Sequence, residues 1–99
     1  MIQHIVLFRF RADADPEAVA AAGAALRAMP ERIAEIRGLH FGPNVGPSAA
    51  EWSHVLVVTC DDMAAVERYG DHPVHRDTVA RFLAPIREAR LAVDVETPA

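Results

Sequence analysis

Apolar residues form continuous runs in some parts of the chain and alternate with polar residues in others. Residues 2–10 and 52–60 are continuous runs rich in β-branched and aromatic side chains, which predict two strands. Residues 39–45 and 91–96 alternate apolar with polar side chains, which is typical of strands with one buried face. The pattern therefore predicts four strands.

Helical spacing and helix-starting residues fill the intervals between these strands. The alanine-rich run at 15–29 begins with Asp-Pro-Glu, a typical helix start, and predicts a long helix. Residues 31–36 are expected to form a further short turn after a proline. Two aspartates begin a predicted helix at 61–69, and a proline opens another that is expected to run over 73–88.

The resulting order, β-α-β-β-α-β, predicts an α+β fold of the ferredoxin-like type, a four-stranded antiparallel sheet with helices on one face. In this plan the first and third strands are central, and both carry apolar residues on both faces. Helices cover only one face, so the other is expected to pack against a second copy, giving a dimeric α+β barrel. A smaller patch, or cover by a different protein, is the alternative. The residues expected at the dimer interface are Ile5, Leu7, Val55 and Val57, with Leu91, Val93 and Val95 beside them.

Length and composition limit the classes of protein to which the chain belongs. Residues 1–99 suffice for a single domain, with 52% hydrophobic residues, 24% charged residues and a net charge of −4. The sequence lacks the basic stripe that would indicate a nucleic-acid partner. No apolar stretch is long enough for a membrane helix, and the N-terminal residues do not resemble a signal peptide. Cys60 is the only cysteine and lies in an apolar strand, so we expect a buried thiol and a cytoplasmic location.

The histidines are the candidate chemical groups, because imidazole titrates near neutral pH. If the helices cover the face that bears His4 and His54, these two converge with Tyr69, His75 and Asp94 on one cavity. His75, oriented by Asp94, would then remove a proton, and Tyr69 would donate a hydrogen bond to a carbonyl or enolate oxygen. The substrate-binding wall is expected to comprise His4, His54, Val6, Phe8, Leu56 and Val58.

Each of these residues also has a purely structural interpretation. A histidine placed like His4 or His54 is more often a hydrogen-bonded core residue. His72 fits a local turn contact, and His40 fits a solvated side chain. For Tyr69, and for His75 with Asp94, a packing role and a chemical role fit about equally well. No HExxH, CxxC or glycine-rich phosphate loop is present, so we expect neither a metal nor a cofactor.

Several segments resemble the Dabb family, the stress-responsive dimeric A/B barrel domains. They are the first strand from Ile2, residues 42–45, residues 54–59, and above all the segment 69–75 (Tyr-Gly-Asp-His-Pro-Val-His) with the Leu-Ala-Pro at 83–85. The resemblance covers about the whole chain and implies a ferredoxin-like protomer and a homodimer. A plant polyketide cyclase of this family performs an aldol-type condensation without a cofactor, and its site implies roles for residues matching Tyr69, His75, His4, His54 and Asp94. Alanines surround Ala22 where that cyclase has a pocket tyrosine.

Three functions are therefore open. The first is an enzyme, such as a cyclase, aldol-type lyase or isomerase, that moves a proton on a small apolar or carbonyl-bearing molecule. The second is a non-catalytic ligand-binding or stress-associated homodimer. The third is a cofactor-free monooxygenase, for which Asn44 and Trp52 would be further candidates.

Overall fold

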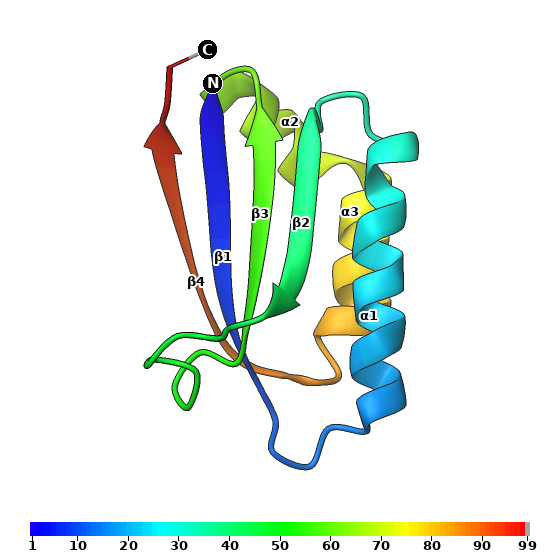
Figure 1. Cartoon of the computed structure of the whole chain (residues 1–99). Coiled ribbons are helices and arrows are strands. Elements are labelled where there is room, and N and C mark those ends of the chain that lie inside the picture. The colour runs from blue at the N-terminus through cyan, green and yellow to red at the C-terminus, as the bar shows by residue number, and fades with distance from the viewer. Residues whose placement is uncertain (99) are drawn as a thin grey trace.

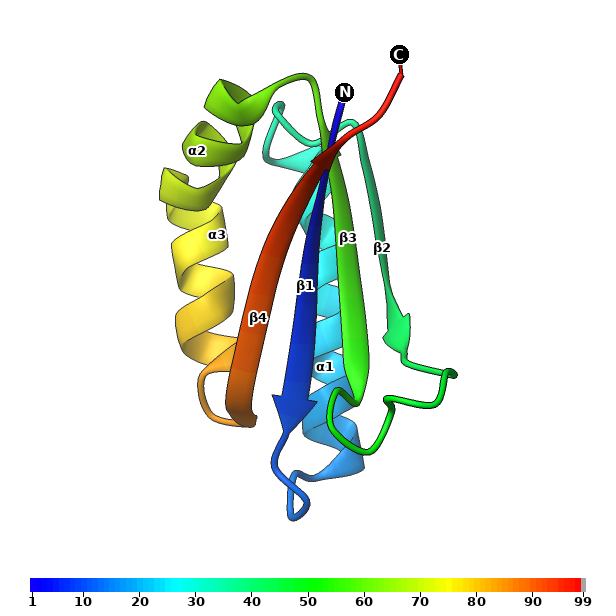
Figure 2. The ribbon, with the colours of Figure 1, turned by 90° about the vertical axis from the view of Figure 1, so that its left-hand side faces the viewer.

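The computed structural model describes residues 1–98 and forms one sheet with helices on one side (Figure 1). The strands lie in the order β2-β3-β1-β4, and every neighbouring pair is antiparallel. Figure 2 shows α1, α2 and α3 on the same side of this sheet. The elements are β1 (Ile2–Phe10), α1 (Pro16–Ala28), a 3-10 turn (Met29–Glu31), β2 (Gly38–Pro43), β3 (His54–Cys60), α2 (Met63–Asp71), α3 (Pro73–Thr78), a π-helical turn (Val79–Leu83) and β4 (Arg87–Glu96).

The predicted fold class is confirmed, with the apolar strands β1 and β3 at the centre of the sheet. The predicted helix over 73–88 is wrong in its second half. Regular α-helix ends at Thr78, a π-helical turn follows, and the chain enters β4 at Arg87. Pro85 lacks an amide hydrogen to continue a helix, and the backbone from Arg87 onward pairs with β1 instead.

The predicted helix starts are confirmed by their capping bonds. The carboxylate of Asp15 accepts a hydrogen bond from the backbone N–H of Glu17 at 2.9 Å, and that of Asp62 accepts one from Ala65 at 2.8 Å. At the start of α3, His72 Nδ1 accepts from the N–H of Val74 at 3.1 Å, which is the expected local turn contact.

The strand register separates two faces of the sheet. On the helix side, Val6 lies opposite Leu56 and His4 opposite Val58, and all of these side chains except His4 are buried in the core. On the other side, Ile5 lies opposite Val57 and Val93. This second set of residues, called the open face below, consists of Ile5, Leu7, Val55, Val57, Leu91, Val93 and Val95.

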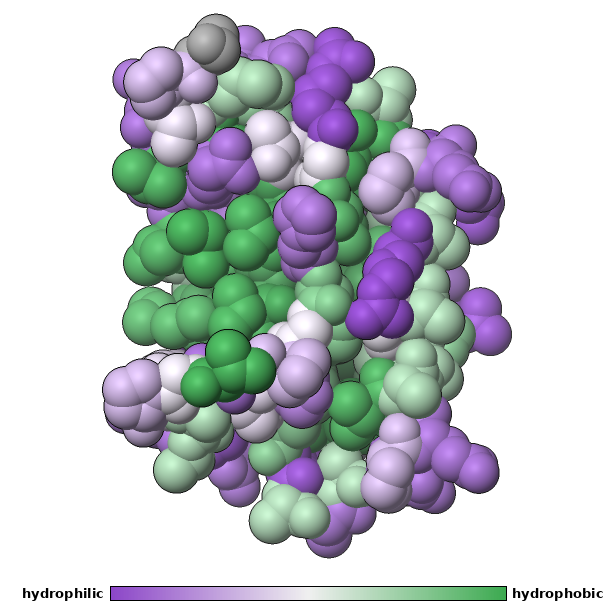
Figure 3. All heavy atoms as spheres, in the orientation of Figure 1, coloured by the Kyte–Doolittle hydropathy of each residue, from purple (hydrophilic) through white to green (hydrophobic). Residues whose placement is uncertain are grey.

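The open face is apolar and is not covered within the protomer. Leu91, Val93 and Val95 remain 46%, 47% and 48% exposed. Figure 3 shows hydrophobic side chains gathered on this side, over the region of β4 and β1. A continuous apolar patch of this kind marks an interaction surface in most water-soluble folds. No helix among residues 1–98 has the length and apolar character that crossing a membrane would need.

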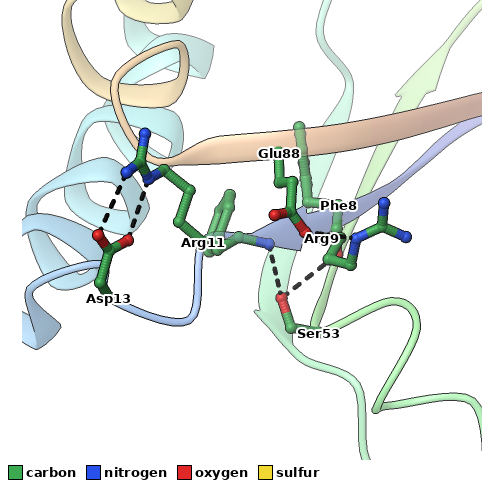
Figure 4. Close-up of polar contacts among 7 residues, drawn as sticks. Phe8, Arg9, Arg11, Asp13, Ser53 and Glu88 are labelled. Carbon is green, nitrogen blue, oxygen red and sulfur yellow. Dashed lines mark hydrogen bonds and ion pairs between the residues drawn. The ribbon is translucent and has the colours of Figure 1, made fainter.

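Polar contacts tie the last residues of β1 to their neighbours (Figure 4). The Ser53 hydroxyl accepts a hydrogen bond from the N–H of Phe10 at 3.1 Å and donates one to the carbonyl of Phe8 at 3.3 Å. Arg9 donates to Glu88 of β4 at 2.7 Å. These contacts hold β3 and β4 to the same end of β1.

Replacing Ser53 by alanine is expected to destabilise the fold by about 1–2 kcal/mol, because the Phe10 amide would lose its partner at a part-buried site. Urea unfolding measures the change. Ser48→Ala is the control, since Ser48 is exposed and its hydroxyl accepts only a solvent-exposed hydrogen bond from the Asn44 amide, so its effect should stay within about 0.5 kcal/mol. Equal effects of the two substitutions would contradict this role for Ser53.

Candidate functional site

A cavity of about 560 Å³ lies between the helix-side face of the sheet and the helices. Strands β1, β3 and β4 provide one wall, and α1, α2, α3 and the π-helical turn provide the other. Its lining combines an apolar body with a smaller polar set. The apolar residues are Val6, Phe8, Leu26, Leu56, Val66, Val79 and Leu83, and the polar or charged ones are His4, Glu67, Tyr69, Asp71, His75, Arg87 and Arg90.

His75 lines this cavity from the first turns of α3, where Pro73 and the His72 cap set the direction of the helix. Its Nδ1 lies 2.9 Å from the carbonyl oxygen of Gly70. A carbonyl only accepts, so Nδ1 carries the proton and the Nε2 of a neutral ring keeps its lone pair. Burial lowers the pKa of His75, and the bond to Gly70 offsets this only in part. His75 is thus held as a neutral imidazole whose second nitrogen is available as a base.

Tyr69 packs beside His75, with ring centroids 4.6 Å apart, and its side chain is buried. Burial raises the pKa of its hydroxyl strongly, so the group stays protonated over the whole neutral range. No side-chain oxygen or nitrogen among residues 1–98 is fully buried without a hydrogen-bond partner. Tyr69 lines the cavity, and its hydroxyl has a proton to donate.

His4 and Asp94 form a hydrogen-bonded pair on neighbouring strands. His4 Nδ1 lies 2.7 Å from Asp94 Oδ1, because the register sets His4 directly opposite Asp94. A carboxylate accepts, so Nδ1 donates and the ring orientation is fixed. The His4 ring meets Tyr69 edge-on at 6.0 Å. The expected orientation of His75 by Asp94 is therefore incorrect, since Asp94 orients His4 and the Gly70 carbonyl orients His75.

The other sequence-predicted residues divide into two groups. Val6, Phe8 and Leu56 line the cavity, whereas Val58 is fully buried in the core and does not. His54 also lies outside the cavity wall. It stacks against Phe41 at 5.7 Å and Phe10 at 4.6 Å, its Nδ1 contacts the Ser53 hydroxyl, and burial lowers its pKa.

Asn44 and Trp52, the candidates for monooxygenase chemistry, belong to the loop between β2 and β3. The Asn44 amide donates to the Trp52 carbonyl at 2.8 Å and its oxygen accepts from the N–H of Gly46 at 2.9 Å. These bonds shape the loop, and neither residue lines the cavity. Across residues 1–98, no three histidine, cysteine or acidic side chains gather as metal ligands. Cys60 is buried, as expected, and burial raises the pKa of its thiol.

Arg87 and Arg90 line the cavity although the sequence analysis did not select them. Arg87 falls within the helix predicted over 73–88, and Arg90 lies between that helix and the strand predicted at 91–96, so neither was placed on an alternating strand. Had the alternating pattern of 91–96 been continued backward, Arg90 would have fallen on the side of Ala92 and Asp94. Arg87 carries no such signal, because a bulge between Arg9 and Phe10 changes the register at that point.

The folded protein is expected to lose stability as the pH falls below about 6.5, the unperturbed histidine value. Burial lowers the pKa of both His75 and His54, so the unfolded chain binds protons more readily than the folded one. Their contribution is complete above that value and declines as the pH falls through the folded-state pKa. From pH 7.5 to pH 5.5, the urea unfolding midpoint should decrease more in the wild type than in His75→Asn. Equal decreases in the two proteins would contradict the assignment for His75.

Comparison with known proteins identifies relatives over almost the full chain. The model of the Stress responsive A/B Barrel Domain (Dabb) matches residues 2–97. A dimeric protein of unknown function and ferredoxin-like fold from Bacteroides fragilis is 32% identical, with a TM-score of 0.81 over 97% of this chain and 95% of that chain. No curated protein matches the sequence significantly.

Two further solved structures extend this likeness. A dimeric ferredoxin-like protein of unknown function from Thermobifida fusca is 32% identical, with a TM-score of 0.83 over 97% of this chain and 90% of that chain. The hydroxynitrile lyase of Passiflora edulis has a TM-score of 0.82 over 95% of this chain and 90% of that chain, at 17% identity. At that identity the last comparison bears on the fold alone.

Proposed function

Since the chain belongs to the stress responsive A/B barrel domain family, we propose that it is a homodimer whose protomers each perform cofactor-independent proton transfer on a small carbonyl compound. One observation carries the catalytic part. The Nδ1 of His75 is committed to the Gly70 carbonyl, which leaves Nε2 as a neutral base on a residue that lines an apolar cavity. Tyr69, in contact with the same ring, supplies a protonated hydroxyl.

The proposed step breaks a C–H bond next to a carbonyl group. Nε2 of His75 takes the proton, the C–H electron pair moves into the new enolate, and the Tyr69 hydroxyl donates a hydrogen bond to the enolate oxygen. The electron pair then takes a proton at a different carbon, which is isomerisation, or attacks a second carbonyl of the same molecule, which is an aldol-type cyclisation. His4, oriented by Asp94, borders the same space and is the candidate second proton donor or acceptor.

The hydroxynitrile lyase of Passiflora edulis has the same fold, and the activity in its name is stated of that protein alone. The proposal for this chain rests on its own His75, Tyr69 and cavity. A cytosolic location is part of the proposal, supported by the free, buried Cys60.

A dimer through the open face is the assembly that we propose. Its support is the exposure of Leu91, Val93 and Val95 beside the central strands. The 32% identical proteins from Bacteroides fragilis and Thermobifida fusca are both described as dimeric. Pairing two open faces would remove the apolar surface from water and leave each cavity on the opposite side of its sheet.

The catalytic proposal is tested by exchange of the α-protons of 2-hexanone in deuterium oxide, followed by proton NMR at neutral pH. The wild-type protein should accelerate exchange above buffer, and Tyr69→Phe, which removes the hydroxyl and little volume, should slow it about 10-fold or more. Exchange at the rate of buffer, or equal rates for wild type and Tyr69→Phe, would count against the proposal.

A further inference from the structure

Two arginines line the cavity without a carboxylate partner among residues 1–98. Every basic residue of the chain is an arginine, and most of them form ion pairs. Arg27 donates to the Phe41 carbonyl instead. Only Arg32, Arg87 and Arg90 have neither kind of partner within residues 1–98, and the last two share the cavity wall.

The acids near these arginines are already engaged or lie on other elements. Glu88, between them in sequence, pairs with Arg9 at 2.7 Å. Asp94, further along β4, pairs with His4. Of the two acids that line the cavity from α2, Asp71 contacts Arg76 at 3.4 Å, and Glu67 is exposed. The guanidinium groups of Arg87 and Arg90 therefore keep their donors available.

The backbone of β4 is shaped so that both arginines reach the same side. Residues three apart on a regular strand point to opposite faces. The register shift opposite Arg9 and Phe10 breaks that alternation, pairing Arg87 with Phe10 while Arg90 pairs with Phe8. Since Phe8 and Phe10 both belong to the helix-side core, the bulge brings two positive charges to one wall.

Both arginines line the same cavity as the proposed catalytic groups. Burial is the larger influence on the pKa of His75 and of Tyr69, and the positive charge of Arg90 acts on both, lowering each value. A negative group bound at Arg90 would remove that effect on His75. The cationic and the acid–base groups thus belong to one continuous site.

We propose that the cavity binds an apolar carboxylic acid, whose carboxylate contacts Arg87 and Arg90 and whose carbon chain lies along Val6, Leu56 and Leu83. The planar guanidinium group matches a carboxylate through two parallel hydrogen bonds, and the apolar remainder of the wall suits a hydrocarbon body. This inference rests on the proposed function and names its substrate class, a carbonyl compound that carries a carboxylate.

The experiment is an NMR titration of the full chain with hexanoate and with hexanamide, which differ in charge and little in size. Hexanoate should bind more tightly than hexanamide. The double variant Arg87→Gln/Arg90→Gln should lose about 10-fold or more of its hexanoate affinity and none of its hexanamide affinity. Arg32→Gln is the matched control, because Arg32 is also unpaired within residues 1–98 and lies outside the cavity wall, and it should bind hexanoate as the wild type does.

Three results would overturn the inference. They are equal binding of the acid and the amide, unchanged hexanoate affinity in the double variant, and competition by inorganic phosphate as effective as that by hexanoate. Hexanoate binding by His75→Asn separates the two proposals, because this variant lacks the proposed base and keeps both arginines of the proposed carboxylate site. Binding without exchange activity in the wild type would refute proton transfer alone, whereas exchange of 2-hexanone without hexanoate binding would refute the carboxylate site alone.

Discussion

Replacing His75 by asparagine is expected to slow α-proton exchange of 2-hexanone by about 10²- to 10⁴-fold, the usual contribution of a positioned general base. The asparagine amide is able to donate to the Gly70 carbonyl in place of Nδ1, so the contact that shapes the start of α3 is retained. The lone pair of Nε2 is lost. Proton NMR of exchange, with circular dichroism of the variant, measures activity and fold separately.

His72→Asn is the matched control for this variant. His72 caps α3 and does not line the cavity, and asparagine is a good capping residue. Its exchange rate should equal that of the wild type. If His75→Asn keeps both full exchange activity and ligand affinity, the base is another group. If the wild type and His75→Asn both bind hexanoate and neither exchanges protons, the chain is a binding protein.

Replacing Val93 by lysine is expected to convert the proposed dimer into monomers at micromolar concentration. Val93 lies opposite Ile5 on the open face and is 47% exposed in the protomer. Burying an ammonium group there without a partner costs several kcal/mol per ion, which weakens association by about 10³-fold or more. Size-exclusion chromatography with light scattering gives the mass directly.

Val45→Lys makes the same chemical change away from the sheet. Val45 is 95% exposed in the loop after β2, so this variant should remain dimeric. A monomeric wild type, or a dimeric Val93→Lys protein, would contradict the proposed interface.

Much of the fold follows from local patterns. Strands β1 and β3 are apolar on both faces, which predicts their central position. Asp15 with Pro16 predicts where α1 begins, and Asp62 predicts where α2 begins. The division between a helix-side face with His4 and an open face with Ile5 follows from the period of two in these strands, and it is present in the structure.

The site was predicted less completely, because its details depend on contacts between elements. The partner of Asp94 is decided by the register of β4 on β1, which places His4 opposite it. His54 lies on the expected face, but Phe10 and Phe41 hold it away from the cavity wall. Arg87 is brought to the wall by a bulge, a feature that the alternation of side chains does not encode.

The central claim, that His75 is a neutral base with a free Nε2, is tested most directly by nitrogen-15 NMR of its imidazole ring at pH 7. This measurement needs no substrate. The account predicts a neutral ring that is protonated at Nδ1, toward the Gly70 carbonyl, with an unprotonated Nε2. A ring that carries its proton on Nε2, or is protonated on both nitrogens at this pH, would contradict it.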